Sequence, residues 1–274
     1  MVRFVVTGFS NFVGVPDNPT ERLVEMLEQR GPGSSVAGSP AYSIFGTAVL
    51  EVAAQPAREW LAQLYASPEL AAAAAECPVV LLHLGVDARA LGFKLEQQAV
   101  NDATFRVPDQ RGWQPTGQLI DDRPGCTLNT HLKTDLDVGQ LAAQLAGQQG
   151  HNVAVSRDAG RFVCNFTYYL SLLHSQTARQ LRGAPLHALF VHVPPTTVAP
   201  LDQQFAFLLD VLAAVAAALT PAISSTYVGK YLASQAAVHI AAERAVDEHG
   251  KDPFQAVAAD AAAANVAEAT EASA

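Results

Sequence analysis

Short runs that are apolar at every position alternate along the chain with segments whose apolar residues recur at helical spacing. The clearest runs are "VRFVVTG" at 2–8, "PVVLLHLG" at 78–85 and "LHALFVHVP" at 186–194, and each ends in glycine or proline. Strands that are buried on both faces have this pattern. Strands that alternate with helices predict a three-layer α/β/α sandwich around a mixed twisted sheet, folded as a single domain over residues 1–222.

Weaker patterns predict the remaining elements. We expect strands at 45–53, 91–101 and 152–156, helices at 19–30, 55–66, 137–148 and 201–219, and a long polar loop region at 102–128. Asn18 is a suitable N-cap for the first of these helices, because Pro19 fits the first helical position. Residues 223–249 are expected to add a helical segment, and the Ala-rich stretch 250–274 is expected to be a disordered tail.

The composition argues against several classes of protein. Hydrophobic residues make up 50% of the chain, enough for a core, and the net charge of −9 with no visible basic patch predicts no nucleic-acid partner. The most apolar long stretch, 205–219, carries Asp210 and stops at Pro221, which indicates a core helix rather than a membrane span. The three cysteines have no metal-ligand spacing and no signal peptide is visible, so we expect free thiols, a cytoplasmic location, and no metal or cofactor.

Cys164 lies in "DAGRFVCNFTYYLSLLHS", at the start of another predicted helix. Phe162, Phe166 and Tyr169 share one face of that helix, which places Cys164 in its first turn. There the free N–H groups and the helix dipole favour a thiolate and can stabilise an oxyanion. A cysteine is also typical of a small buried core residue, and position alone favours that interpretation.

A nucleophilic cysteine needs a base, and two of the eight histidines lie in the predicted buried strands near their carboxyl ends. His192 in "FVHVPP" lies at the edge where open α/β sheets place their sites, and His83 in "LLHLG" is a second candidate of the same kind. Each could instead be a hydrogen-bonded core residue. Glu96 in the alternating segment 91–101 is either the residue that orients the histidine or a strand residue that faces solvent. Periodicity does not decide between these alternatives.

The loop after the first strand, "TGFSNFVG", contains Phe9 and Phe12. It lacks the lysine of a phosphate-binding loop and the closely spaced glycines of a dinucleotide fingerprint. The two aromatic side chains either cap the core, which is the commoner role, or form part of a binding surface.

Taken together and in order, four segments resemble the pyroglutamyl peptidase I family, the cysteine peptidases that remove N-terminal pyroglutamate. "VTGFSNFVGVPDNP" is similar to the family's N-terminal motif, "HLGVDARALGFKLEQQAVN" to its glutamate segment, "SRDAGRFVCNFTYY" to its cysteine segment and "FVHVPP" to its histidine segment. Each motif is weak alone, whereas four in this order with sensible spacing are specific. The resemblance covers the chain from about residue 2 to about residue 219.

The resemblance implies that Cys164 is the nucleophile, that His192 is first the general base and then the acid, and that Glu96 orients His192. The reaction it implies passes through a thioester acyl-enzyme and needs no cofactor. The implied partners are N-terminally pyroglutamylated peptides, with no nucleic acid and no membrane. The oligomeric state stays open, with a homo-oligomer as one alternative.

The resemblance also implies that Phe9 and Phe12 flank the lactam ring of the substrate and that Asn18 helps to shape the pocket. This chain departs from the family after "HLG", where small residues are common, because Asp87 and Arg89 add side chains near the expected oxyanion region. Two other functions remain as alternatives. One is a catalytically silent homologue that binds a peptide or partner through the same pocket. The other is nucleoside phosphorolysis on a related α/β fold, which leaves the cysteine without a role.

Overall fold

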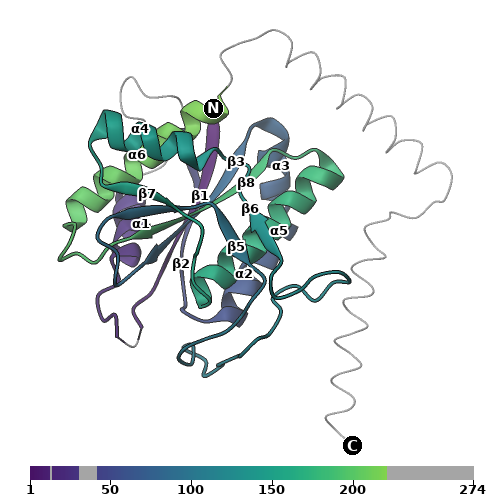
Figure 1. The fold of residues 1–274 in the computed structure, drawn as a ribbon. Coiled ribbons are helices and arrows are strands. Elements are labelled where there is room, and N and C mark those ends of the chain that lie inside the picture. The colour runs from purple at the N-terminus through teal and green to yellow at the C-terminus, as the bar shows by residue number, and fades with distance from the viewer. Residues whose placement is uncertain (13, 31–41, 221–274) are drawn as a thin grey trace, which may run out of the picture. The chain divides into compact units, whose positions relative to one another are not determined.

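A six-stranded sheet forms the middle layer of the computed structural model, in the order β2-β1-β3-β8-β4-β7 (Figure 1). Its strands are β1 (Val2–Phe9), β2 (Tyr42–Leu50), β3 (Val79–Val86), β4 (Phe93–Glu96), β7 (Val153–Ser156) and β8 (Leu186–Val193). Neighbouring strands are parallel except for β4 and β8, which are antiparallel, so the sheet is mixed as predicted. The structure describes residues 1–12, 14–30 and 42–220, and the segments predicted at 223–249 and 250–274 lie outside the described residues.

Helices cover both faces of this sheet (Figure 1). One group comprises α1 (Pro19–Gln29), α4 (Val138–Gln149) and α6 (Leu201–Leu219), and the other comprises α2 (Ala54–Ala66), α3 (Pro68–Glu76) and α5 (Val163–Arg182). The apolar side chains of the two groups belong to two separate buried clusters, each of which includes one face of the sheet. The three-layer sandwich predicted from the alternating pattern is therefore confirmed.

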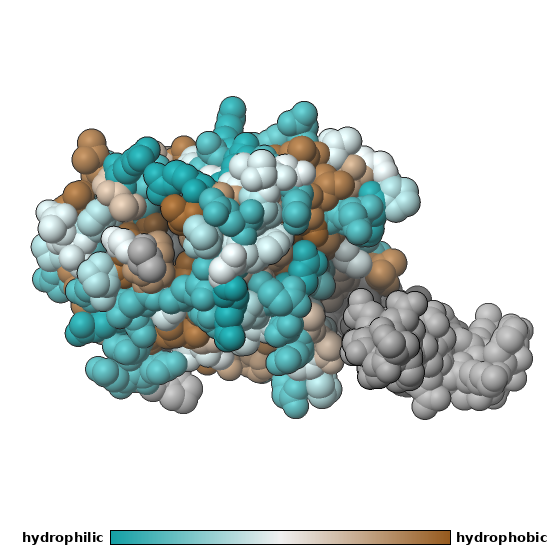
Figure 2. Space-filling model, turned by 90° about the horizontal axis from the view of Figure 1, so that it is seen from below, coloured by the Kyte–Doolittle hydropathy of each residue, from teal (hydrophilic) through white to brown (hydrophobic). Residues whose placement is uncertain are grey.

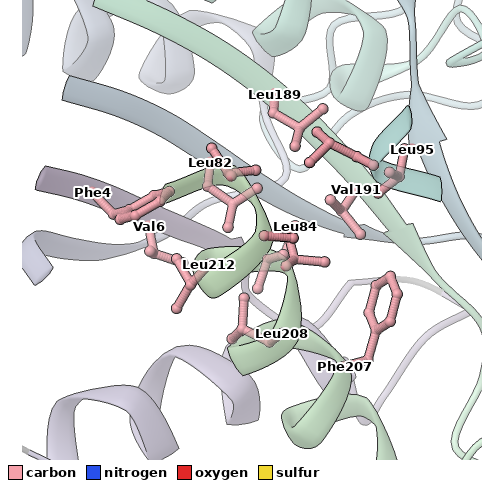
Figure 3. Close-up of a cluster of buried hydrophobic side chains, with 14 of the residues drawn as sticks. Phe4, Val6, Leu82, Leu84, Leu95, Leu189, Val191, Phe207, Leu208 and Leu212 are labelled. Carbon is pink, nitrogen blue, oxygen red and sulfur yellow. The ribbon is translucent and has the colours of Figure 1, made fainter. Parts of the chain in front are cut away.

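The central strands are buried on both faces because their side chains alternate between the two clusters. In β3, Leu82 and Leu84 belong to the cluster with α6, whereas Val79 and Leu81 belong to the cluster with α5. Figure 3 shows the first cluster, in which the labelled residues are Phe4, Val6, Leu82, Leu84, Leu95, Leu189 and Val191 from the strands and Phe207, Leu208 and Leu212 from α6. This alternation is why each central strand is a continuous apolar run in the sequence.

The first helix begins where the sequence predicts. The Thr20 N–H donates to the Asn18 side chain at 3.1 Å, and Pro19 is the first helical residue. The helix then packs directly on β1 at Gly8, where a Cβ atom would lie 2.3 Å from the Thr20 carbonyl oxygen. Only glycine allows α1 to approach the strand this closely.

The prediction of one strand at 91–101 is wrong. The segment forms two strands, β4 and β5 (Gln98–Val100), and β5 leaves the main sheet to pair with β6 (His131–Lys133). Leu91, the first residue of the predicted strand, is 81% exposed and precedes β4. Alternation indicates which residues share a face of a strand, but it does not indicate where a strand changes partners. Residues 102–128 form the expected long loop region.

Among the described residues, α6 is the one helix that is long and apolar enough to cross a membrane, judged by length and composition. Its Phe207, Leu208 and Leu212 side chains are buried against the sheet, and the core helix of a globular domain passes the same test (Figure 3). The face of the molecule in Figure 2 is largely hydrophilic, with apolar residues interspersed among polar ones. The helix is therefore the core helix that the sequence predicts.

We predict that Gly8→Ala destabilises the fold by about 1–3 kcal/mol, the usual cost of overpacking, because the added methyl group meets backbone atoms that have no room to move. The free energy of unfolding in urea measures this change. Gly46→Ala in β2 is the matched control, since no atom lies within 4 Å of a Cβ there, and its effect should stay within about 0.5 kcal/mol. Equal stability of the two variants would contradict the close packing of α1 on β1.

Candidate active site

Cys164 is the second residue of α5, so it lies in the first helical turn as predicted. The N-cap residue, Phe162, makes no side-chain cap hydrogen bond, and the Phe166 N–H donates to the Phe162 carbonyl at 3.1 Å. The N–H groups of the first turn therefore lack a side-chain cap, and their partial positive charge favours an anion at this end of the helix. The Cys164 side chain is partly exposed, as a nucleophile must be.

Gly85 in β3 lets the cysteine sulfur approach the sheet. A Cβ atom at this position would lie 3.0 Å from Cys164 Sγ and 2.7 Å from the Phe190 ring, so a larger residue would displace them. Gly85 is also the register partner of His192 in the parallel pair of β3 and β8. Strand pairing thus brings His192 beside the point where the sulfur lies.

Glu96 is the last residue of β4 and is fully buried, so the alternative of a solvent-facing residue is wrong. Because β4 is antiparallel to β8, with Lys94 opposite His192 and Glu96 opposite Phe190, the Glu96 and His192 side chains share one face of the sheet. Glu96 Oε1 lies 2.8 Å from His192 Nδ1. Helix α5 packs against this face of the sheet, so Glu96 is buried although it is a polar residue of an alternating strand.

His192 connects the other two residues and is itself 7% exposed. Its Nδ1 bonds to Glu96, which leaves Nε2 available to interact with Cys164. Burial disfavours the imidazolium, but the hydrogen bonds and charges of Cys164 and Glu96 outweigh burial and raise the pKa of His192 to about 10. The site therefore favours a protonated His192 ring at neutral pH.

His83 is a core residue in the structure. Its Nδ1 lies 2.7 Å from Thr7 Oγ1, its Nε2 lies 2.9 Å from Ser171 Oγ, and the side chain is fully buried. Burial lowers the pKa of His83 to about 3, so the ring is neutral. Both ring nitrogens are occupied, which leaves His83 no free nitrogen with which to serve as the base.

The three residues expected to bind substrate lie in different environments. Phe9 is 2% exposed, and its ring centroid lies 6.5 Å from that of Phe190, so it belongs to the core. Asn18 is buried, and its Nδ2 donates to the Ser10 carbonyl at 3.0 Å, which holds the loop between β1 and α1. Phe12 is half-buried, with its ring centroid 6.5 Å from that of Phe162, and thus lies beside the start of the cysteine helix.

Sequence reasoning missed an aromatic cluster that the long loop region adds to this helix end. The Phe105 ring lies 4.8 Å from Phe162 and 5.2 Å from Trp113, and the Trp113 ring lies 6.0 Å from Phe166. Trp113 is partly exposed, whereas Phe105 is buried. Two large aromatic residues in an otherwise polar segment were the available signal, because such side chains in a loop usually pack on something.

Asp87 and Arg89 lie in the loop that follows β3. Asp87 Oδ2 bonds to Lys94 Nζ at 2.6 Å, and its Oδ1 accepts the Arg89 N–H at 3.0 Å, while the Arg89 side chain is exposed. Burial opposes ionisation of Asp87, but these hydrogen bonds and the charges of Lys94 and His192 outweigh it and lower the pKa of Asp87. The loop thus adds the Asp87 carboxylate near His192, and Lys94 offsets the negative charge of this carboxylate.

These features define a class of protein. Cys164 is partly exposed at an uncapped helix start, it interacts with the buried His192, and His192 is bonded to the buried Glu96 carboxylate. This is the arrangement of a cysteine-nucleophile hydrolase. Here the arrangement sits on a three-layer α/β/α fold. Among the described residues, no group of three or more histidine, cysteine or acidic side chains could hold a metal ion.

The chain belongs to the pyroglutamyl peptidase family, whose model matches residues 2–227. It is 29% identical to the pyrrolidone-carboxylate peptidase of Pyrococcus furiosus, over 70% of this chain and 81% of that protein. It is also 29% identical to that of Gloeobacter violaceus, over 70% and 82% of the two chains. The crystal structure of the pyrrolidone carboxyl peptidase from Fervidobacterium islandicum is similar, with a TM-score of 0.62, 26% identity and coverage of 78% of this chain and 98% of that one. The resemblance identified from four sequence segments is confirmed.

We predict that His192 keeps its proton through neutral pH and loses it near pH 10, and that Glu96→Gln lowers this pH because the carboxylate charge that raises the pKa is gone. NMR titration of protein with carbon-13 at histidine Cε1 measures both, with the His192 signal assigned from a His192→Gln variant. His83 is the internal control, since it should stay neutral over the same range. Titration of His192 near its ordinary pKa of about 6.5 in both proteins would show that the ion pair does not form.

Proposed function

We propose that this chain is a cysteine peptidase that removes an N-terminal pyroglutamyl residue from peptides. The observation that carries the proposal is the hydrogen bond between His192 and Glu96, with Cys164 interacting with the same ring, in a chain of the pyroglutamyl peptidase family. A catalytically silent homologue has no use for a buried carboxylate paired with an imidazolium, because burying both charges costs free energy. A nucleoside phosphorylase has no use for the cysteine.

In the proposed mechanism, the Cys164 thiolate attacks the carbonyl carbon that joins pyroglutamate to the next residue. N–H groups at the start of α5 stabilise the oxyanion of the tetrahedral intermediate. His192 donates its proton to the leaving amine, which leaves a thioester between Cys164 and the pyroglutamyl group. His192 then takes a proton from the water that hydrolyses the thioester. Glu96 orients the ring and stabilises the imidazolium in both half-reactions.

The proposed specificity follows from the charge of the substrate. Closure of the lactam ring removes the charged amine of an ordinary N-terminus, so a flat neutral ring can enter an aromatic surface without desolvating an ammonium. In this proposal Phe12 contacts the ring beside Phe162, Phe9 backs the site from the core, and Asn18 holds the loop that carries Phe12. A free glutamyl or glutaminyl N-terminus is then a poor substrate.

The proposed location is the cytoplasm. The thiols of Cys77, Cys126 and Cys164 are all free, and a thiolate nucleophile stays active only where thiols remain reduced. Peptides with an N-terminal pyroglutamyl residue are the partners that the proposal requires.

We predict that the protein releases a reporter amine from a pyroglutamyl amide at least about tenfold faster than from the matching prolyl and alanyl amides, a difference of ~1.4 kcal/mol in transition-state binding. Cys164→Ala should abolish release while the thermal unfolding midpoint stays near that of the wild type. Cys77→Ser and Cys126→Ser are the matched controls and should remain active. Equal rates on the three amides, or turnover by Cys164→Ala, would refute the proposed function.

We predict that Phe12→Ala lowers kcat/KM for a pyroglutamyl amide about tenfold or more, because it removes apolar contact with the lactam ring. Phe12→Tyr keeps the ring face and should lose less. Phe45→Ala on the edge strand β2 is the control, since it removes a partly exposed aromatic side chain of the same size. If Phe12→Ala retains the wild-type preference for the pyroglutamyl amide, the lactam ring is recognised elsewhere.

A further inference from the structure

The Glu96 carboxylate has few restraints of its own. Its Oε1 bonds to His192, whereas its buried Oε2 has no hydrogen-bond partner among the described residues. A carboxylate with one bond is not oriented by its own contacts, so its direction depends on the backbone that carries it. That backbone lies at the end of β4, where the chain leaves the main sheet for the two-stranded sheet of β5 and β6.

Two hydrogen bonds hold the peptide unit between Glu96 and Gln97. The Tyr168 hydroxyl donates to the Glu96 carbonyl at 2.8 Å, and the Gln97 N–H donates to the Ser156 carbonyl at 2.7 Å. Because a peptide unit is planar, bonds at its two ends fix its rotation, and this rotation sets the ψ angle of Glu96. Tyr168 is fully buried, so water does not replace its hydroxyl if that hydroxyl is removed.

The hydroxyl comes from the helix that carries the nucleophile. Tyr168 follows Cys164 by one helical turn in α5. Asn165 ties the same helix to the chain beyond Glu96, because its side chain accepts the Val100 N–H and donates to the Val100 carbonyl, both at 2.9 Å. Helix α5 therefore sets the distance between the sulfur and the segment that carries the carboxylate.

We propose that Tyr168 is a positioning residue, whose hydroxyl holds the Glu96 backbone so that the carboxylate stays bonded to His192. Tyr168 acts through Glu96 and makes no hydrogen bond to the sulfur or the imidazole. Its effect on turnover rests on the proposed function. Its effect on the protonation of His192 does not, because the ion pair exists without substrate.

The protonation of His192 reports on this contact. The titratable groups that face the imidazole are Glu96 from β4, Cys164 from α5, Asp87 just after β3, and its partner Lys94, which lies on β4 opposite His192. The Tyr168 hydroxyl makes no hydrogen bond to Cys164, Asp87 or Lys94. The hydroxyl also interacts with the Phe190 backbone and the Thr134 side chain, so a change in the His192 titration is assigned to Glu96 by its disappearance in a Glu96→Gln background.

The experiment compares the His192 titration and the steady-state kinetics of the wild type, Tyr168→Phe and Tyr169→Phe. Tyr169 is the matched control, because it is equally buried and its hydroxyl has no hydrogen-bond partner among the described residues. Tyr168→Phe should shift the His192 titration to lower pH, in the direction of Glu96→Gln, and lower kcat about three- to tenfold with KM unchanged. Tyr169→Phe should leave both at the wild-type values.

A double variant separates positioning from a merely structural role. Tyr168→Phe added to Glu96→Gln should cause no further shift in the titration, because the charge that it positions is already absent. A shift that adds in full, or a Tyr168→Phe protein with the wild-type titration, would overturn the proposal. If the wild type does not hydrolyse a pyroglutamyl amide, the proposed function fails, and the titration still decides the role of Tyr168.

A second variant covers the case in which Tyr168→Phe does not fold. Replacing Tyr168 by 3-fluorotyrosine keeps the ring and its hydroxyl but makes the hydroxyl a stronger donor to the Glu96 carbonyl. The His192 titration should then move to higher pH than in the wild type. A titration that stays the same or moves to lower pH would overturn the proposal.

Discussion

The buried charge of Glu96 is the constraint on which the site depends. A carboxylate removed from water is tolerated only where an opposite charge and hydrogen bonds compensate its lost hydration. His192 supplies that charge at 2.8 Å, and it is protonated only because Glu96 and Cys164 flank it. The charged state of His192 thus depends on both of its neighbours, so the three residues are coupled and not independent of one another.

The sheet creates this unit through one antiparallel strand. The parallel pair of β3 and β8 places Gly85 beside His192, and the missing side chain of Gly85 leaves room for the sulfur. In an antiparallel pair, residues on one face reach their diagonal neighbours, and Glu96 lies opposite Phe190 and therefore diagonal to His192. The short strand β4 thus places Glu96 beside His192. Because the chain leaves the main sheet after Glu96, the following strand β5 packs against the start of α5.

The site combines a charged interior with an aromatic surround. Cys164 lies at a helix end whose N–H groups favour an anion, whereas Phe12, Phe105 and Phe162 surround that same end with apolar rings. The charged part suits a thiolate and an oxyanion, and the aromatic part suits a flat ring without a charged amine. Under the proposed function, a neutral pyroglutamyl group therefore suits this site better than an ordinary charged N-terminus.

The sequence by itself determined the elements and much of their placement. Continuous apolar runs predicted the buried strands, Asn18 and Pro19 predicted the start of α1, and helical periodicity placed Cys164 in a first turn. Four segments also indicated the family. Only the tertiary structure decided that His83 is a neutral core residue, that the segment after Leu91 breaks at Gln97, and that Tyr168 holds Glu96. Periodicity reports the local geometry of the backbone, whereas Glu96 and His192 are 96 positions apart, and their contact follows from strand order and direction, which no local pattern contains.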